Sequence, residues 1–506
     1  MWSVRQGNEV VDWLEIGAST FSVWDVQTLG KKKQWYHSVI LIEPYEEHCL
    51  LLKEMYPIAT VMNVAVSDHD GEVPFFYVAD LDIEKNNLPK WVKGCKSIGE
   101  PHPTIKDMCV MQSRNVSLLS YESLVTRIGL AYLSVLKIDC EGHDCVILNN
   151  AFKVWSKDRN QRPMEILFEW NKLTSIEDVH HVDRVLTSSF GYYFAGRQGG
   201  DNVVYKRIMR AAIYTEGKWA FGRIYFAVRD VLAEFGIQVT FYDWAKCNFS
   251  TIVNLPPSII IGSTYLGKLA KEANLDKSNH RFVLTTHCPI FNYQGFDEFP
   301  VVLDNAHYTC PCIEGCRNYA SFVNAPVSCT PFGADESCFF TDRFAISHFM
   351  KVIGTRLKTP ESRKFWLEMI KLADPGKFDF RESNYSETTP IIAELERGQE
   401  IYMGLDVYVS VTEFEGGPLS IFEAAALGLI VFTRKNVGSA SKIEGIKQFE
   451  TPSELLELFN YYERNVTERE EYRKAIQREV RSKWGMRYLI HKYFLPVVLK
   501  AGNEVF

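Results

Sequence analysis

The chain of 506 residues is too long for a single hydrophobic core and long enough for about three or four compact domains. Apolar residues make up 46% of it and charged residues 24%, which excludes a mainly disordered, collagen-like or disulfide-stapled protein. The 56 basic and 63 acidic residues give a net charge of −7 without long Lys/Arg runs. This balance disfavours general nucleic-acid binding, which depends on neutralising phosphates.

No apolar run approaches the roughly 20 residues that span a bilayer, and the first residues do not resemble a secretion signal. The 12 cysteines are scattered, which favours reduced thiols in a cytoplasmic protein. The tightest group, Cys310, Cys312 and Cys316 with His307 upstream, has metal-ligand residue types. Its spacing is shorter than that of a zinc-finger knuckle and no second pair follows, so we interpret it as a loop with reduced thiols.

Apolar runs of strand length alternate with amphipathic helical patterns, which indicates parallel α/β units. Residues 85–113 are rich in Pro, Lys and Gly and are expected to form an inserted loop or lid. In the first part of the chain the expected strands are 11–16, 39–43, 61–66, 135–139, 165–169 and 202–205, and the expected helices are 45–55 and 120–128.

The pattern restarts after Lys206 with a strand, a glycine-bearing turn and a helix, and restarts again near Pro331. The last stretch, 483–500, is expected to be helical with a kink or end at Pro496. We therefore expect an α/β protein of four segments: 1–206, 207–330, 331–484 and a terminal helix over 485–506.

Three expected strands carry acidic residues at their carboxyl ends, which is where an open α/β sheet binds ligands. Glu15 precedes the small-residue turn Gly17-Ala18, which lets a ligand approach the backbone. Glu43 ends the next apolar strand, where a carboxylate can accept hydrogen bonds from ribose hydroxyls. Asp139 and Glu141 end a third strand.

The order and spacing of these motifs resemble the FkbM-like family of S-adenosylmethionine-dependent methyltransferases. The resemblance covers nearly all of residues 8–206. It rests on Glu-Ile-Gly-Ala (15–18), Ile-Glu-Pro-Tyr (42–45), Asn-Val-Ala-Val-Ser-Asp (63–68), Leu-Lys-Ile-Asp-Cys-Glu-Gly-His-Asp (136–144) and Asp-Asn-Val (201–203).

The resemblance implies a doubly wound Rossmann-like domain that methylates hydroxyl groups with S-adenosylmethionine. It places Asp139 first and His143 second as the base that helps remove the hydroxyl proton. An ordinary histidine without a catalytic role remains the alternative for His143. By the same resemblance, the methionine end of the cofactor contacts Glu15, Gly17 and Ala18. The resemblance also implies that Glu43 holds the ribose and that the turn with Ala65 flanks the adenine. Glu141 would face the reacting centre.

One position departs from the family pattern. Relatives carry a further glycine three residues after the Gly-Ala pair, where this chain has Phe21. A phenyl group there could crowd the methionine pocket, so loss of methyl transfer stays open as an alternative.

The sharpest motif of the chain lies in its second half. An apolar strand runs into Glu415-Gly-Gly-Pro-Leu419, and a helix with Glu423 follows. Pro418 stands where a helix tolerates a missing N–H, and the helix N-terminus would face an anion such as a diphosphate. Two carboxylates on either side of this turn can point to one cleft.

This block resembles the donor-binding signature of retaining, family-4-like glycosyltransferases of the GT-B fold, and the likeness extends over about 208–506. It implies that Glu423 binds the donor ribose, Glu415 the transferred sugar, and the turn Gly417, Pro418, Leu419 the reacting end. His287 is either a sugar contact or a structural histidine. Gly222 belongs to the first glycine-bearing loop, and the diphosphate contacts come from among Arg356, Lys358, Arg363 and Lys364. Without an Asp-x-Asp motif we expect no metal.

These patterns favour a bifunctional enzyme that transfers a sugar from a UDP- or GDP-sugar to a glycan acceptor and O-methylates a sugar hydroxyl. Two alternatives stay open. One is a glycosyltransferase whose N-terminal half is a non-catalytic binding module. The other is a methyltransferase whose C-terminal half is a docking scaffold.

Overall fold

The computed structural model describes two compact units. The N-terminal unit reaches to Met209 and adds Glu234–Ile237 and Phe506; the C-terminal unit comprises Arg210–Ala233 and Gln238–Val505. Within the described part of the chain, no helix has both the length and the apolar character needed to cross a membrane. The described residues are 9–20, 38–198, 201–215, 219–286, 302–323, 327–340, 350–355, 360–382, 402, 404–412, 419–435 and 437–506.

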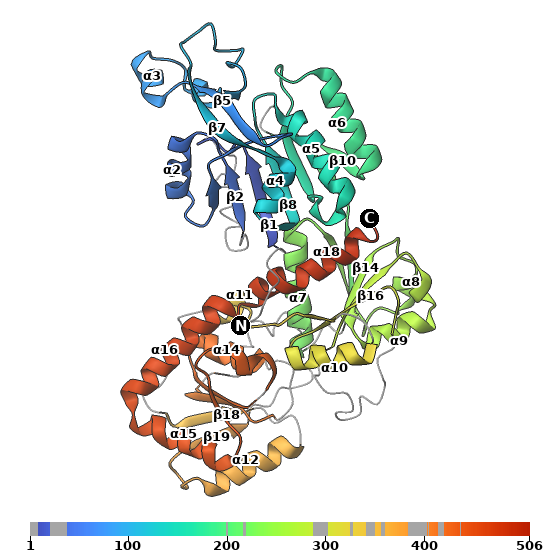
Figure 1. Cartoon of the computed structure of the whole chain (residues 1–506). Helices are drawn as coiled ribbons and strands as arrows, with labels where there is room; N and C mark the ends of the chain where they lie inside the picture. Colours follow the sequence, from blue (N-terminus) through green and yellow to red (C-terminus); the bar gives the residue numbers. More distant parts are fainter. Residues whose placement is uncertain are drawn as a thin grey trace. The chain divides into compact units, whose positions relative to one another are not determined.

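A seven-stranded sheet in the order β10-β11-β9-β8-β1-β2-β3 forms the centre of the N-terminal unit (Figure 1). Neighbouring strands are parallel, except that β11 runs antiparallel to β9 and β10. The strands are β1 (Glu9–Ile16), β2 (Val39–Ile42), β3 (Thr60–Met62), β8 (Leu130–Ile138), β9 (Glu165–Glu169), β10 (Tyr192–Gln198) and β11 (Asn202–Arg207), and the helices are α2 (Glu46–Met55), α4 (Tyr121–Arg127), α5 (Asp144–Lys157) and α6 (Ile176–Ser189).

Apolar side chains cover both faces of this sheet. Along β2, Ile40 and Ile42 belong to the core that includes α4, α5 and α6, whereas Leu41 packs in a second core with Leu52 of α2. A strand that is buried on both faces is apolar at successive positions, which is how β2 and β8 read in the sequence. The arrangement is the doubly wound Rossmann-like domain expected above.

The expected inserted loop is a structured subdomain that begins earlier than residue 85. A four-stranded sheet in the order β4-β7-β5-β6 spans residues 65–120 and has a small apolar core that includes Ile83, Val92 and Ile105. Residues 85–113 themselves contain the 3-10 helix Lys90–Gly94 and the two-residue strand Ser97–Ile98, which are too short to show a clear period, and this is why the sequence alone indicated a loop. Its elements are β4 (Ala65–Ser67), β5 (Gly71–Tyr77), α3 (Asp80–Lys85), the 3-10 helix η1 (Lys90–Gly94), β6 (Ser97–Ile98) and β7 (Gln112–Ser120).

Two all-parallel sheets form the C-terminal unit, in the orders β13-β12-β14-β15-β16-β17 and β19-β18-β20-β21-β22. The first comprises β12 (Arg210–Thr215), β13 (Gln238–Asp243), β14 (Ile259–Ser263), β15 (Arg281–Thr285), β16 (Ala306–Cys310) and β17 (Val327–Cys329), with α7 (Trp219–Glu234), α8 (Ser250–Val253), α9 (Tyr265–Glu272) and α10 (Ile313–Val323). The second comprises β18 (Val352–Thr355), β19 (Asp379–Glu382), β20 (Val407–Ser410), β21 (Ile430–Arg434) and β22 (Lys447–Phe449), with α11 (Glu336–Phe339), α12 (Pro360–Leu372), α14 (Leu419–Leu427), α15 (Pro452–Arg464) and α16 (Val466–Lys483).

The C-terminal helices connect the two sheets (Figure 1). Helix α16 packs on α14 beside the second sheet, and α18 (Leu495–Asn503) packs on strands β14 to β16 of the first. Between them lie α17 (Met486–Leu489) and a π-helical turn, Ile490–Phe494. Pro496 stands in the first turn of α18, where its missing N–H is tolerated. Two parallel sheets with a terminal helix that returns to the first are the expected GT-B arrangement, so the predicted fold class is confirmed.

A backbone contact ties the segment between the two sheets to the start of these helices. Ala334 N–H donates to the Trp484 carbonyl at 3.0 Å, and Met486 N–H donates to the Ala334 carbonyl at 2.7 Å. A Cβ on Gly333 would lie 1.8 Å from the Trp484 carbonyl oxygen. Only glycine therefore lets these two segments approach so closely.

Candidate functional site

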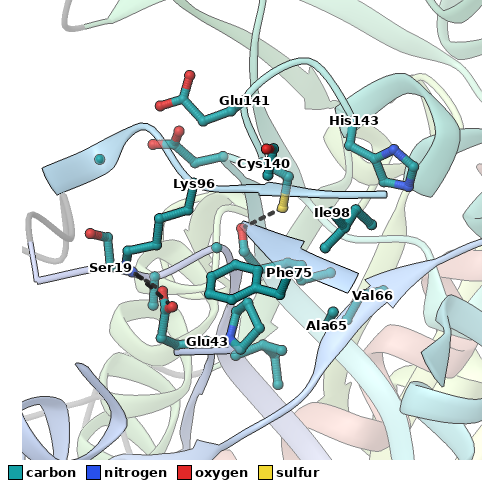
Figure 2. A pocket seen from close by; sticks show the side chains of 18 of the residues that line it. Ser19, Glu43, Ala65, Val66, Phe75, Lys96, Ile98, Cys140, Glu141 and His143 are labelled. Atoms are coloured by element: carbon teal, nitrogen blue, oxygen red, sulfur yellow. Dashed lines mark hydrogen bonds and ion pairs between the residues drawn. The ribbon is translucent and has the colours of Figure 1, made fainter. Parts of the chain in front are cut away.

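The candidate site is a cavity of about 440 Å³ in the N-terminal unit, where β1, β2 and β8 end (Figure 2). Its volume lies in the usual range for small-molecule sites. The main sheet contributes one side and the inserted subdomain the other. The lining residues are Ile16, Gly17, Ala18, Ser19, Ile42, Glu43, Pro44, Val64, Ala65, Val66, Phe75, Trp91, Gly94, Lys96, Ser97, Ile98, Lys137, Asp139, Cys140, Glu141 and His143.

The turn after β1 brings the backbone close to the end of β8. Gly17 has φ +85°, and a Cβ there would lie 2.0 Å from the Asp139 carbonyl oxygen. The N–H groups of Gly17 and Ala18 both donate to the Ile42 carbonyl at 3.0 Å. Glycine is thus required at position 17, and the turn forms a close-fitting cradle at the strand edge where nucleotides bind in such sheets.

Glu43 is almost completely buried at the end of β2, with its carboxylate at the cavity. Its Oε2 accepts from Ser19 N–H at 2.8 Å, its Oε1 accepts from Tyr45 N–H at 2.8 Å, and Lys96 Nζ lies 3.4 Å from Oε1. Two carboxylate oxygens offer about four acceptor positions, so Oε2 keeps one for a ligand. The carboxylate is held in place by the backbone and is ready to accept a hydroxyl donor.

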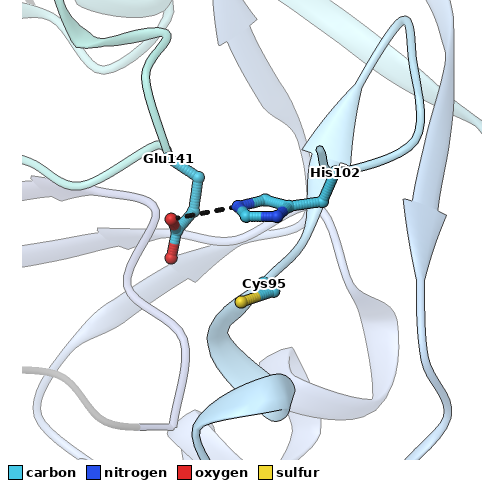
Figure 3. A group of neighbouring side chains, drawn as sticks. All are labelled: Cys95, His102 and Glu141. Carbon is cyan, nitrogen blue, oxygen red and sulfur yellow. Dashed lines mark hydrogen bonds and ion pairs between the residues drawn. The ribbon is translucent and has the colours of Figure 1, made fainter. Parts of the chain in front are cut away.

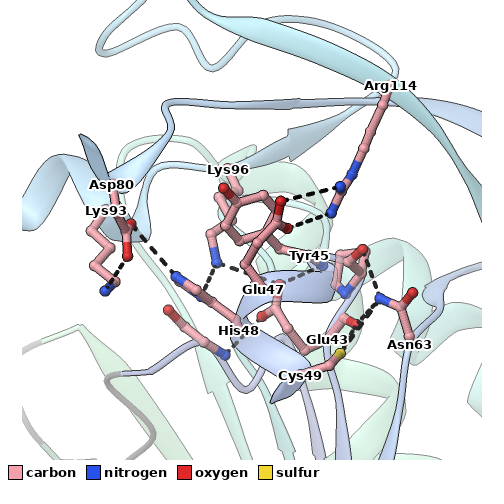
Figure 4. A network of polar contacts seen from close by, with 12 residues as sticks. Glu43, Tyr45, Glu47, His48, Cys49, Asn63, Asp80, Lys93, Lys96 and Arg114 are labelled. Carbon is pink, nitrogen blue, oxygen red and sulfur yellow. Dashed lines mark hydrogen bonds and ion pairs between the residues drawn. The ribbon is translucent and has the colours of Figure 1, made fainter. Parts of the chain in front are cut away.

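Lys96 connects Glu43 to the inserted subdomain (Figure 4). Its Nζ donates to His48 Nδ1 at 2.5 Å, and Lys93 pairs with Asp80 at 2.6 Å beside the same histidine. Burial and, next, the charge of Lys96 lower the pKa of His48 to about 3, so this imidazole is neutral and its Nδ1 accepts a hydrogen bond from the lysine ammonium. Burial also lowers the pKa of Lys96, although the neighbouring Glu43 opposes this.

A buried ion-pair network supports the floor of the cavity. Lys137 Nζ lies 2.8 Å from Glu15 Oε1 and 3.0 Å from Asp139 Oδ2, and Trp13 Nε1 donates to Glu15 Oε2 at 3.0 Å. Burial alone would lower the pKa of Lys137, but the two carboxylates outweigh it and raise that pKa. Glu15 therefore lies beneath the cavity as a partner of Lys137, whereas Asp139 is partly exposed in its lining.

The turn after β8 carries the other candidate catalytic groups. Glu141 has φ +50°, an unusual conformation for a non-glycine residue, and its side chain faces the cavity. His143 Nε2 lies 2.8 Å from Ser67 Oγ. Burial lowers the pKa of His143, with Asp68 opposing, so the imidazole is neutral and can accept a proton. The structure thus brings Asp139, Glu141 and His143 to one cavity with Glu43.

Comparison with known proteins bears on this half of the chain. Residues 15–194 match the family described as Methyltransferase FkbM domain. This part of the chain is an FkbM methyltransferase domain. None of the curated proteins matches the chain.

Two solved structures resemble the chain loosely. One is sucrose-phosphate synthase from Thermosynechococcus elongatus, with a TM-score of 0.43, 12% identity, and coverage of 56% of this chain and 96% of that one. The other is the apo form of the lipopolysaccharide outer core galactosyltransferase WaaB, with a TM-score of 0.37, 12% identity, and coverage of 58% and 99%. At these scores the likeness is too loose to carry an argument, and the fold assignment rests on the strand order.

The FkbM domain also holds acidic groups that the sequence analysis did not single out. Glu169 ends β9, and Asp144 starts α5, where it accepts from the N–H groups of Cys140 and Glu169. Burial raises the pKa of Asp144 to about 7. Burial, and then the carboxylates of Glu141 and Asp139, raise the pKa of Glu169 to about 8. Position 169 ends a predicted strand, so the strand-end rule could have found it.

We expect the variant Glu169→Gln to change how stability depends on pH. Between about 4.5 and about 8 the folded chain keeps a proton on Glu169 that the unfolded chain loses, so wild-type stability falls as pH rises through this window. One full proton would give about 1.4 kcal/mol per pH unit, and partial exposure of the side chain makes the slope smaller. The variant should therefore gain stability relative to wild type as pH rises.

Calorimetric unfolding of the full chain across this pH range measures the effect. The control is Glu122→Gln, an exposed residue that pairs with Lys157. Parallel stability curves for wild type and Glu169→Gln would show that Glu169 is not protonated in the folded domain.

In the C-terminal unit, Glu423 lies on α14 and is 2% exposed. Tyr402 Oη donates to its Oε2 at 2.6 Å, and Arg223 Nη2 lies 2.8 Å from its Oε1.

The other predicted residues of this unit are spread over several elements. Leu419 begins α14, Gly222 is buried in α7, and Lys364 is exposed on α12. Phe21, His287, Arg356, Lys358, Glu415, Gly417 and Pro418 lie outside the residues that the structure describes.

The cysteine group of this unit is part of a buried cluster. Cys310, Cys312 and Cys316 pack together, with Cys329 of β17 beside them. Cys310 and Cys329 are register neighbours on β16 and β17, and all four are reduced cysteines. Cys316 Sγ donates to the Cys310 carbonyl at 3.6 Å, a contact that fits an interior of reduced thiols.

Proposed function

We propose that the chain is a bifunctional enzyme that modifies glycans. The FkbM domain transfers a methyl group from S-adenosylmethionine to a sugar hydroxyl. The C-terminal unit transfers a sugar from a UDP- or GDP-sugar to the glycan acceptor with retention of configuration. The observation that carries the first activity is the cavity in which the glycine cradle, the Glu43 carboxylate and the Asp139 carboxylate meet.

The residues of the cavity fit S-adenosylmethionine. Gly17 and Glu43 lie together in the lining, and the open acceptor position of Glu43 Oε2 suits a ribose hydroxyl. The second ribose hydroxyl would replace Lys96 at Oε1, because that contact is the longest of the three. The segment with Ala65 lies beside this carboxylate in the lining, where it would flank the adenine.

When bound, the cofactor supplies an electrophilic methyl group. The chain's own residues orient the acceptor and take up its proton. Asp139 is our first candidate for the base, because its carboxylate is open to the cavity and is positioned by Lys137 at 3.0 Å. Glu141 is proposed to contact the acceptor, and His143, held by Ser67, is the second candidate base. Positioning of the hydroxyl supplies much of the rate enhancement.

The proposed sugar transfer rests on the motif around Glu423 and on the GT-B arrangement. Glu423 would bind the donor ribose and Glu415 the transferred sugar, with the turn Gly417–Leu419 at the reacting end. Arg223 and Tyr402 hold the Glu423 carboxylate in place, one at each oxygen. For these two activities we propose four segments, with the methyltransferase domain at 1–206 and the glycosyltransferase at 207–330, 331–484 and 485–506.

Mass spectrometry of a panel of acceptor glycans tests the proposal. Each glycan is incubated with UDP- and GDP-sugars, with and without S-adenosylmethionine. Addition of both a sugar mass and a methyl mass is the expected result. Sugar addition alone would make the FkbM domain a binding module, and methylation alone would make the C-terminal unit a scaffold. Addition of neither mass, together with no binding of either donor in calorimetric titration, would contradict both activities.

A further inference from the structure

Three side chains with metal-ligating atoms meet at the edge of the FkbM cavity (Figure 3). Cys95 follows η1, His102 lies between β6 and β7, and Glu141 lies in the turn after β8. Their ligand atoms all lie within 4.8 Å of one another. His102 Nε2 and Glu141 Oε2 are 3.2 Å apart.

The three side chains differ in how far they are exposed to the cavity. Cys95 and His102 are buried, at 7% and 1% exposed, whereas the side chain of Glu141 is 22% exposed and lines the cavity. Two ligands are thus held inside the protein and the third reaches toward the space that a substrate would enter. From this geometry we infer that Cys95, His102 and Glu141 bind a divalent transition-metal ion, with Zn²⁺ the best match.

The chemistry of the three ligand atoms determines which metal ions can bind. A thiolate and an imidazole exclude Mg²⁺ and Ca²⁺, which take oxygen ligands, and they suit Zn²⁺. Zinc sites with three protein ligands keep a fourth position open for water or substrate. Two ligands at about 2.0–2.1 Å from a tetrahedral zinc stand about 3.3 Å apart, close to the observed separation of His102 and Glu141.

Metal binding requires two proton changes. Thr104 N–H donates to His102 Nδ1 at 3.3 Å, so Nε2 carries the proton and donates to Glu141 when no metal is bound. With a metal on Nε2 that proton moves to Nδ1, and the long Thr104 contact is lost. Cys95 gives its thiol proton to solvent, since the thiolate is the ligand. One proton is therefore released for each metal ion bound.

The open position of the ion would face the cavity and take a water or an acceptor hydroxyl; this last assignment rests on the proposed function, but the metal site itself does not. The competing explanation is that His102 and Glu141 form only a hydrogen bond that anchors the inserted subdomain. In that case Cys95 would be an apolar member of the subdomain core.

Cobalt titration of the full chain, after treatment with a chelator, separates these explanations. We expect one Co²⁺ per chain, a thiolate-to-cobalt charge-transfer band, the intense visible bands of a tetrahedral site, and displacement by one equivalent of Zn²⁺. Cys95→Ser should remove the charge-transfer band and weaken binding by roughly 100-fold or more, since loss of an outer-shell partner alone costs about 10–100-fold. Cys109→Ser, on the same subdomain and half-buried, is the matched control and should keep the spectrum.

Two further variants make the outcome unambiguous. If Cys95→Ser does not fold, Glu141→Gln provides an independent test, because it removes another proposed ligand and should also weaken cobalt binding. Cys316→Ser tests the other cysteine cluster, and should leave the spectrum unchanged. A wild-type protein that binds no cobalt, or a charge-transfer band that survives Cys95→Ser and disappears in Cys316→Ser, would overturn the site. Titration with S-adenosylmethionine in parallel distinguishes failure of the metal site from failure of the proposed methyl transfer.

Discussion

Replacing Glu43 by alanine is expected to abolish measurable binding of S-adenosylmethionine. Hydrogen bonds from hydroxyl groups to a carboxylate contribute about 1.5–3 kcal/mol each, so the loss of two ribose contacts corresponds to a fall in affinity of roughly 100-fold or more. The variant also removes the acceptor for Ser19 N–H and Tyr45 N–H, which fix the turns on either side of the cavity. Glu43→Gln keeps the size of the side chain and should show most of the same loss.

Calorimetric titration of the full chain measures this prediction. Glu47→Gln is the matched control, because Glu47 lies on the adjoining helix α2, is exposed and pairs with Arg114. Nucleotide-sugar binding serves as an internal check, since its proposed site lies in the other unit. Normal cofactor affinity in both Glu43 variants would refute the ribose assignment and, with it, the proposed use of the cavity.

The strand-end carboxylates of this cavity could be predicted from the sequence because the rule behind them is topological. Once β1, β2 and β8 are recognised as parallel, Glu43 and Asp139 must reach the same edge of the sheet. The Gly17 turn followed from the same reasoning. These positions need only the order of the strands and the point at which each one ends.

Glu15 shows what strand order alone does not provide. It pairs in register with Lys137 on the neighbouring strand, and the two side chains meet under the sheet edge. Which face a strand residue uses depends on the exact register, because successive side chains alternate between faces. A pattern that predicts a strand end to within a residue or two cannot decide between the cavity and the layer beneath it.

The contributions of the inserted subdomain could not be predicted for a different reason. His102 reaches Glu141 across 39 positions of the chain, and Lys96 reaches Glu43 across 53. The segment has little periodicity, so the sequence did not indicate where its side chains point. The predicted strand 61–66 also divides into β3 and β4 of different sheets, where Asn63 donates to the Glu43 and Pro44 carbonyls. A continuous apolar run conceals such a break.

Glu423→Gln is expected to lower sugar transfer by roughly 100-fold or more while methylation of a preformed acceptor continues at the wild-type rate. A neutral amide gives weaker hydrogen bonds to the donor ribose than a carboxylate does. The change also removes the charge that pairs with Arg223 at 2.8 Å, and breaking a buried pair costs about 3–5 kcal/mol. Loss of activity could therefore come from donor binding or from folding, and the experiment has to separate them.

The double variant Arg223→Met with Glu423→Gln provides that separation. Replacing both partners of a buried pair is often nearly neutral for stability, so the double variant should unfold close to the wild-type temperature and still fail to transfer sugar. Glu444→Gln, an exposed carboxylate that pairs with Lys483, is the control and should keep both activities. If the double variant recovers stability and sugar transfer together, the carboxylate is structural and the donor ribose is bound elsewhere. If single and double variants both lose methyl transfer as well, the two activities are not housed in separate units.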